Sequence, residues 1–202
     1  MMTILYEVRQ GLYVNLTNKC CNDCTFCLRN FKDREGRSGS LWLDHEPDFG
    51  EVREAFRQFD VPRYKEVVIC GFGEPTEALE RVLQTAGYVK EHWPSMPVRI
   101  NTNGLGNLIN GRNIVPLFKN RIDTVSISLN TPDKERYLEV VRPAFGEKSF
   151  DAMLDFAREC VRTVPHTVLS TVATTISRED EEKCAAICRE IGAAYRIREF
   201  EH

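Results

Sequence analysis

The strongest constraint on the fold is a regular alternation of short β-like segments with longer amphipathic helical ones. This pattern is typical of βα units around a parallel sheet, and right-handed crossovers curl such a sheet in one direction. Six units are too few to close an eight-stranded barrel. Strands are expected at 12–17, 66–71, 97–102, 124–130, 167–173 and 194–198, and helices at 48–60, 77–92, 113–120, 132–140, 149–163 and 177–191.

The two faces of these strands differ in polarity. A parallel sheet covered by helices on both faces would be apolar on both, yet here only one face is apolar, so the other must line something wet or polar. Within 124–130, Val125, Ile127 and Leu129 share one face, and Ser126, Ser128 and Asn130 share the other. Segments 12–17 and 97–103 alternate in the same way. The sequence therefore favours an α/β fold, a partial (β/α)6 TIM-like barrel, over an open doubly wound sheet.

Composition narrows the class of protein. The 202 residues suit one domain, expected to span 1–202. Lys and Arg (27) nearly balance Asp and Glu (30), so no basic excess indicates nucleic acid or an anionic membrane. No apolar run approaches the roughly 20 residues of a membrane span, and the N-terminus does not resemble a signal peptide. We therefore expect a cytoplasmic protein.

Four cysteines lie within eight residues, in "CCNDCTFC". In a cytoplasmic chain such a cluster indicates metal ligands or reactive thiols rather than disulfides. Two registers are open: Cys20, Cys24 and Cys27 as C-x3-C-x2-C, or Cys21, Cys24 and Cys27 as C-x2-C-x2-C. A structural zinc site would need a fourth ligand, and the nearest candidate, His45, lies outside the usual spacing. Three cysteines on a cubane instead leave one iron open. Cys160, Cys184 and Cys188 fall in helical patterns and are expected to be buried.

The C-x3-C-x-aromatic-C pattern resembles the signature of the radical S-adenosylmethionine (radical SAM) enzymes. Its members here are Cys20, Cys24, Phe26 and Cys27, and the pattern follows a first strand, as in that family. The resemblance extends over nearly the whole chain. The segments "YVNLTNKC", "GFGEPT", "RINTNG" and "DTVSISLN" are also similar to a small subgroup named for its association with TatD-type hydrolases.

The resemblance implies a [4Fe-4S] cluster on Cys20, Cys24 and Cys27, whose open iron binds S-adenosylmethionine. It also implies a low-potential electron donor of flavodoxin or ferredoxin type, reductive cleavage of S-adenosylmethionine, and a 5′-deoxyadenosyl radical that abstracts hydrogen from an unidentified substrate. Phe26 belongs to the cofactor site in this scheme, and Cys21 is a bystander. The alternative is a non-catalytic iron–sulfur or zinc-binding module.

"GFGEP" corresponds to the glycine-rich motif of the family. Gly71 and Gly73 would let the backbone approach the methionine part of S-adenosylmethionine, and Glu74 or its neighbouring carbonyl would accept from the ammonium group. Without the resemblance, the same residues are compatible with an ordinary strand-to-helix turn.

Further candidates lie where the predicted strands end, which is where parallel α/β folds bind ligands. The inward polar side chains suit ribose hydroxyls and a carboxylate: Asn101, Asn103, Ser126, Ser128 and Asn130. In several members of the family that the chain resembles, a basic residue near the position of Arg142 meets the carboxylate of S-adenosylmethionine, and a guanidinium does so bidentately. Each also has a plainer interpretation, a solvated groove for the strand residues and a surface side chain for Arg142.

The segment 29–47 is long for a loop, and long loops in compact domains are often functional. Trp42 is expected to anchor it, either as a cover for the cluster or as a solvated loop. Arg196 and Arg198 on the last strand are candidates for the substrate end of the lumen. Because the chain stops soon after that strand, we expect an open barrel that a partner protein, a peptide or a large substrate could complete.

Overall fold

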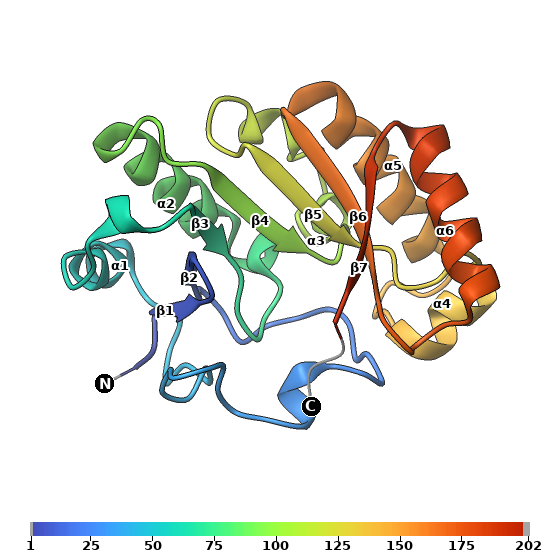
Figure 1. Ribbon diagram of the computed structural model, residues 1–202, viewed down its shortest axis with the longest axis horizontal. Helices are drawn as coiled ribbons and strands as arrows, with labels where there is room; N and C mark the ends of the chain where they lie inside the picture. The colour runs from blue at the N-terminus through green and yellow to red at the C-terminus, as the bar shows by residue number, and fades with distance from the viewer. Residues whose placement is uncertain (1, 200–202) are drawn as a thin grey trace.

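The computed structural model describes residues 2–199 and contains one seven-stranded sheet in chain order, β1 to β7 (Figure 1). β1 pairs antiparallel with β2, and all later neighbours pair parallel. The strands are β1 (Leu5–Val8), β2 (Gly11–Val14), β3 (Glu66–Ile69), β4 (Val98–Thr102), β5 (Thr124–Ser128), β6 (His166–Val172) and β7 (Ala194–Arg198). This mostly parallel open sheet confirms the predicted α/β class.

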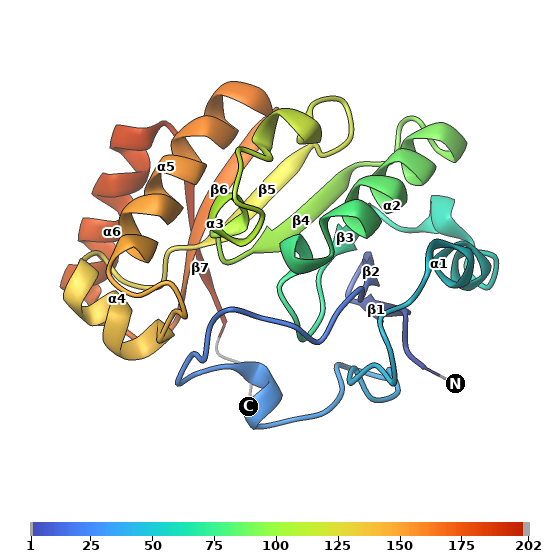
Figure 2. The ribbon, with the colours of Figure 1, turned by 180° about the vertical axis from the view of Figure 1, so that it is seen from behind.

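Most helices cover one face of this sheet. They lie behind it in Figure 1 and in front of it in Figure 2, where α2, α3, α5 and α6 cross the strands. The helices are α1 (Phe49–Phe56), α2 (Leu79–His92), α3 (Gly106–Ile109), α4 (Lys134–Val141), α5 (Lys148–Thr163) and α6 (Arg178–Ile191). Side-chain caps begin several of them, as expected from their first residues: Asp48 forms a capping box at α1, and Ser177 accepts from the Asp180 backbone at α6.

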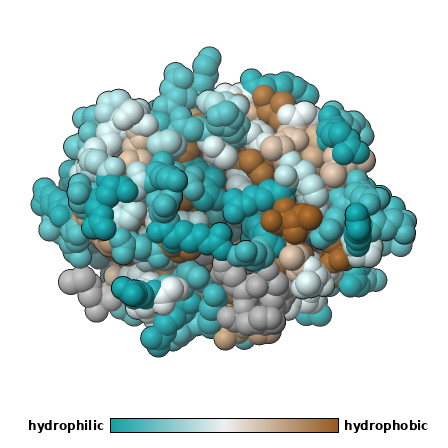
Figure 3. Space-filling view, in the orientation of Figure 1, coloured by the Kyte–Doolittle hydropathy of each residue, from teal (hydrophilic) through white to brown (hydrophobic). Residues whose placement is uncertain are grey.

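The predicted division of the strand faces is confirmed. Val125, Ile127 and Leu129 are fully buried in the core beneath the helices. Ser126 and Ser128 point to the opposite face, which is largely hydrophilic in the space-filling view (Figure 3). An apolar helix-covered face and a polar open face together place ligand-binding capacity on the side without helices.

One predicted helix is wrong, and one strand escaped prediction. Residues 113–120 form only a short 3-10 turn, Val115–Phe118, because Pro116 cannot donate a backbone hydrogen bond and Asn120 adopts a positive φ of 61°. β1 was not predicted, since its few residues alternate only weakly. The strand expected at 12–17 leaves the sheet after Val14, and its continuation becomes part of the site described below.

None of the helices within residues 2–199 is long and apolar enough to span a membrane.

Candidate cofactor site

The four clustered cysteines lie on a loop that leaves β2 and crosses the carboxyl ends of the parallel strands. All four side chains are half-buried. On the strand side, two backbone hydrogen bonds fix the loop: the N–H of Gly73 donates to the Thr17 carbonyl (3.0 Å), and that of Glu74 donates to the Lys19 carbonyl (2.7 Å). The segment after β3 is therefore hydrogen-bonded directly to the residues that precede Cys20.

The other side of the loop is fixed by the end of α4. The Asp23 N–H donates to Val141 (3.1 Å) and the Thr25 N–H donates to Val140 (2.9 Å). The N–H of Ala144, just past the helix, donates to the Cys21 carbonyl (2.8 Å). Backbone atoms from two distant parts of the chain thus set the path of the cysteine loop, and they do so without using any thiol.

The thiols of Cys20, Cys24 and Cys27 form a mutually interacting trio. Burial and, to a smaller extent, the neighbouring Cys27 and Cys20 together raise the pKa of Cys24 to about 12. Burial likewise raises the pKa of Cys20 to about 11, with Cys27 again among the charges that act on it. Cys20 also acts on Cys21, whose sulfur accepts from the Asn103 amide at 3.3 Å. The C-x3-C-x2-C register stays a prediction.

Both glycines of GFGEP lie where an earlier segment of the chain passes very close to their backbone. A Cβ on Gly73 would lie 2.3 Å from the Thr17 carbonyl oxygen and 2.6 Å from that of Lys19. A Cβ on Gly71 would lie 2.0 Å from the Asn15 side-chain oxygen. The sequence attributed these glycines to close approach by a ligand. The structure adds a second requirement, close approach of the cysteine loop itself.

Glu74 is buried and holds the ends of two strands together. Its Oε1 accepts from the Thr76 N–H (3.0 Å), the Thr76 hydroxyl (2.7 Å) and the Thr102 hydroxyl (2.7 Å), and its Oε2 accepts from the Asn103 N–H (2.6 Å). Burial raises the pKa of this carboxyl, while the four donors act in the opposite direction. Only Oε2 keeps a free acceptor site, so a contact to an ammonium group stays a prediction for that one atom.

The polar residues at the strand ends differ in how far other contacts engage them. The Asn103 side chain already has two protein partners, because it bonds both Cys21 and the Leu105 N–H. Asn130, at the end of β5, adopts a positive φ of 67° and is 4% exposed. Its Oδ1 is buried with no hydrogen-bond partner among the described residues. A buried amide oxygen in that state costs about 1–3 kcal/mol unless a ligand or water supplies a donor.

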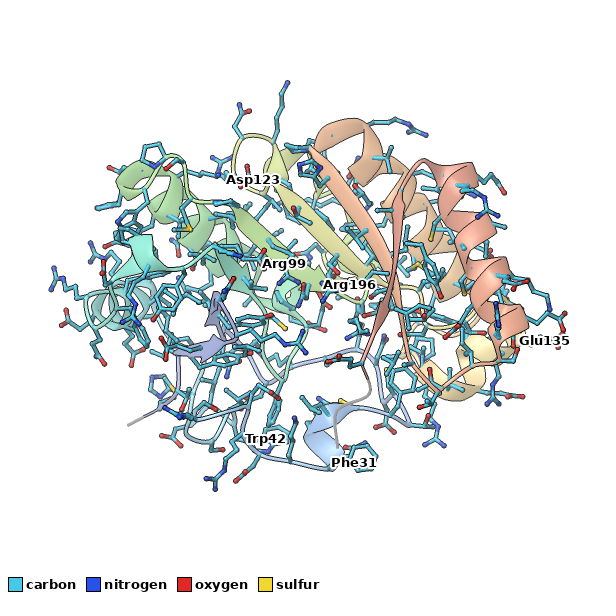
Figure 4. All side chains as sticks on the ribbon, in the orientation of Figure 1. Phe31, Trp42, Arg99, Asp123, Glu135 and Arg196 are labelled. Carbon is cyan, nitrogen blue, oxygen red and sulfur yellow. The ribbon has the colours of Figure 1, made fainter. Side chains whose placement is uncertain are left out.

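Asn101 belongs to a polar network on the uncovered face that the sequence did not predict. Arg99 donates to both carboxylate oxygens of Glu66 (3.0 and 2.7 Å) and to the Asn101 oxygen (2.9 Å). Burial raises the pKa of the neighbouring Cys70 thiol, and Asn101 acts to lower it. Arg99 and Arg196 both project from this face (Figure 4). The alternation of Arg99 with Val98 and Ile100 predicts its place on this face, but its carboxylate partner Glu66 comes from another strand and could not be found from the local sequence.

Arg142 and Phe26 lie beside the cysteines rather than beneath them. Arg142 ends α4 in the left-handed conformation, with φ of 48°, and its exposed guanidinium lies 3.9 Å from the Asp23 carboxylate. Phe26 is half-buried within the loop itself. Both are close enough to the cysteines to keep their predicted roles open.

The segment 29–47 folds back against the first strands. The Asn15 amide donates to the Leu41 carbonyl at 2.7 Å, and Leu41 packs with Tyr6 and Phe72. The Trp42 ring stacks edge-on against Phe72, with ring centroids 5.1 Å apart, as expected for an anchor. The loop runs along the lower edge of the sheet in Figure 4, which labels Trp42 on it.

The sequence model described as "Radical SAM superfamily" matches residues 14–190, most of the chain. This protein belongs to the radical SAM superfamily. The predicted superfamily is therefore confirmed, and the cofactors of this family are the predicted ones, a [4Fe-4S] cluster and S-adenosylmethionine.

Relatives of known function are similar to this radical SAM chain over part of their length. The GTP 3′,8-cyclase of Corynebacterium glutamicum (strain R) is 29% identical over 67% of the chain and 35% of the cyclase. The FeMo cofactor biosynthesis protein NifB of Klebsiella pneumoniae is 27% identical over 61% of the chain and 26% of NifB. The chain spans about a third or less of these relatives.

Solved structures share the radical SAM fold at low identity. Streptococcus suis SuiB bound to the precursor peptide SuiA has a TM-score of 0.67 at 18% identity, with 95% of this chain and 39% of that one covered. Methylornithine synthase (PylB) has a TM-score of 0.65 at 16% identity, covering 95% and 53%. These likenesses establish the partial-barrel fold of the chain.

The donors present suit an iron–sulfur cluster better than a single ion. Among residues 2–199, no three His, Cys, Asp or Glu side chains converge closely enough to hold one metal ion. A [4Fe-4S] cluster places each cysteine on a different iron, so its ligands stand farther apart than those of one zinc. His45, the sequence's zinc candidate, contacts Glu51 at 2.9 Å instead.

Proposed function

We propose that this protein is a radical SAM enzyme that cleaves S-adenosylmethionine reductively and acts on a substrate bound over the uncovered face of the sheet. The cluster would be held by Cys20, Cys24 and Cys27. When bound, the cluster and S-adenosylmethionine supply an electron and a 5′-deoxyadenosyl radical that abstracts hydrogen from the substrate. The protein's part is to bind, orient and shield these groups.

The observation that carries this proposal is the set of half-buried thiols of Cys20, Cys24 and Cys27 on a loop whose backbone is hydrogen-bonded at both ends. Three cysteines leave one iron of a cubane without a protein ligand. A cluster used only for electron transfer has no need of that open position, just as a structural zinc site has none.

The remaining predicted site residues have roles that fit this arrangement. The orphaned Oδ1 of Asn130 could accept from a ribose hydroxyl, and Ser126, Ser128 and Asn101 lie on the same face of the sheet. Gly71 and Gly73 keep the cysteine loop close to the end of β3, and Glu74 positions Asn103 beside it. Arg142 and Phe26 would complete the cofactor site from the loop side.

The finer placement of the protein is also part of this proposal. The motifs given above support a place among the small TatD-associated radical SAM proteins, a label that names a genetic association and implies no reaction. We infer a single domain, a cytoplasmic location and a low-potential donor of flavodoxin or ferredoxin type. The substrate is a small molecule, a peptide or a partner protein that covers the open face.

The test is an anaerobic assay. The protein is reconstituted with iron and sulfide, reduced with dithionite and mixed with S-adenosylmethionine, and 5′-deoxyadenosine is measured. We expect the product from the wild type and its loss in Cys24→Ala. If a complete cluster yields none, electron paramagnetic resonance of the reduced cluster is compared with and without S-adenosylmethionine. An unchanged spectrum would reject the enzyme and favour the non-catalytic iron–sulfur module.

A further inference from the structure

Positive charge exceeds negative charge on the open face of the parallel strands. Alternation along the strands places Glu66 of β3 and Arg99 of β4 on this face, together with Arg196 and Arg198 of β7. One carboxylate thus shares the face with three guanidinium groups, although the whole chain carries a net charge of -3. The excess of positive charge is therefore a property of this face and does not follow from the composition.

The one carboxylate of this face is neutralised by Arg99. Arg99 donates to both oxygens of Glu66, at 3.0 and 2.7 Å, and their side chains are 12% and 31% exposed. Arg99 also donates to the Asn101 oxygen at 2.9 Å, so this amide turns its NH2 group, a donor, toward the rest of the face. This part of the face therefore offers a ligand donors, and its acceptors are already occupied.

Arg196 has no counterion among residues 2–199. It pairs in register with Ser170 of β6, which pairs with Ser128 of β5, so its side chain shares the open face with these hydroxyls (Figure 4). The residue is exposed and makes no hydrogen bond or ion pair within the described part of the chain. The acidic residue that follows on the same segment, Glu199, is paired instead with Arg9 at 2.5 Å.

A ligand on this face must supply acceptors and negative charge. A guanidinium holds its N–H groups in a fixed planar fork, which matches the oxygens of a carboxylate or a phosphate bidentately. Residues two apart on a strand point to the same face and lie about 6.6 Å from each other. Arg198 therefore adds a second positive charge on the same side of the sheet as Arg196.

We propose that the substrate carries an anionic group, a carboxylate or a phosphate, and that the Arg196 guanidinium binds this group. The inference rests on the proposed function, since it takes the open face as the substrate site. Arg196 is in this role a residue that binds and orients the substrate. S-adenosylmethionine also has a carboxylate, for which Arg142 is the predicted partner, so the test must separate the two anions.

The test is chemical modification of the reconstituted protein at low ionic strength. Phenylglyoxal modifies exposed arginines, and mass spectrometry of a digest gives the modification rate at each position. The probes are inorganic pyrophosphate for a phosphate source and malonate for a carboxylate source. At a probe concentration about four times its dissociation constant, about a fifth of the protein is unoccupied, so we expect the modification of Arg196 to slow about fivefold.

Arg189 is the matched control within the same molecule. It is exposed on α6, on the side of the sheet that the helices cover, and it too lacks an ion pair within the described residues. Its modification rate should not change with either probe, because a direct effect of the anions on phenylglyoxal would appear at both positions. In titration calorimetry, Arg196→Gln should lose binding of the protecting probe and Arg189→Gln should keep it.

The same experiment identifies the anion. Protection by pyrophosphate alone indicates a phosphorylated substrate, and protection by malonate alone indicates a carboxylate. Absence of protection by both probes would overturn the inference. Protection of Arg196 by S-adenosylmethionine would overturn it as well, because the guanidinium would then bind the carboxylate of the cofactor. Failure of the wild type to assemble a cluster would reject the proposed function instead, while the protection measurement, which needs no cluster, still reads the anion site.

Discussion

The Oε2 atom of Glu74 accepts a hydrogen bond from the Asn103 backbone N–H at 2.6 Å, and the Asn103 amide donates to the sulfur of Cys21 at 3.3 Å. The end of β3 is thereby linked through the end of β4 to the cysteine loop. The Glu74 backbone N–H also donates to the Lys19 carbonyl, which lies in the segment that leads into the cysteine loop. The glycine-glutamate turn thus sets the spacing between two strand ends and the cysteine loop.

Replacing Glu74 by Gln should destabilise the protein by about 1–3 kcal/mol, the cost of leaving a buried polar group unsatisfied. All four partners of the carboxylate are donors, so the amide NH2 of glutamine must face at least one of them. The free energy of unfolding in urea measures the loss. Glu80→Gln, at an exposed position of α2, is the control and should change little. Equal stability of the two variants would contradict the internal role assigned to Glu74.

Replacing Gly73 by Ala should prevent cluster assembly. The added Cβ meets two backbone carbonyl oxygens, those of Thr17 and Lys19, and neither can rotate away. The loop carrying Cys20 must then shift. Iron content after reconstitution is the measurement, and we expect it to fall well below that of the wild type.

Gly87→Ala provides the comparison for that variant. Gly87 lies within α2, and a Cβ there meets nothing within 4 Å. Alanine in a helix interior is favoured over glycine by roughly 0.5–1 kcal/mol, so this variant should be as stable as the wild type or more so, with normal iron content. A Gly73→Ala protein with normal iron content would show that the crossing tolerates a side chain.

The sequence predicted what depends on local periodicity. The alternation in 124–130 placed Ser126 and Asn130 on the open face, and the positions of the strand ends brought the cysteines, GFGEP and Asn130 to one edge. It did not predict the Arg99–Glu66 pair, because the two residues lie on different strands, 33 positions apart in the chain. The sequence also could not show that the cysteine loop requires a glycine at position 73. The carbonyl oxygens that a Cβ there would meet belong to residues more than fifty positions earlier.

The cysteines of the helices should react slowly in the native protein. Burial raises the pKa of Cys184 to about 12 and that of Cys188 to about 11, from a reference of 9.0. Alkylation requires the thiolate, so at pH 9 we expect iodoacetamide to modify Cys188 about 50-fold and Cys184 about 500-fold more slowly in the folded protein than in urea. Mass spectrometry of the labelled peptides follows both rates, and similar rates in the two states would contradict their burial.

The same shifts make a prediction for stability at high pH. Because the folded-state pKa values lie above the unfolded ones, the folded state holds these protons longer. Their contribution to stability is complete below about pH 9 and declines as the pH rises toward 11–12. Urea unfolding at pH 8 and pH 10 should therefore show a loss that is smaller in Cys184→Ala than in the wild type when each is compared with itself.

Two neighbouring residues distinguish the two registers of the cluster. Cys21 accepts from Asn103 through its sulfur and from Ala144 through its carbonyl, and we expect Cys20 rather than Cys21 to bind the cluster. Cys20→Ala should therefore abolish the cluster. Cys21→Ala removes only a side chain and should leave iron content and the spectrum of the reduced cluster close to those of the wild type.

The pair serves as its own control, because both cysteines are half-buried and adjacent in one loop, and both changes remove a single sulfur atom. A general disturbance of the loop would lower iron content in both variants alike. Loss of the cluster in Cys21→Ala alone would establish the C-x2-C-x2-C register. That result would also move the open iron, because a cluster anchored at Cys21 would lie nearer to Asn103 and farther from Arg29, whose guanidinium donates to the Asn22 carbonyl on the other side of the loop.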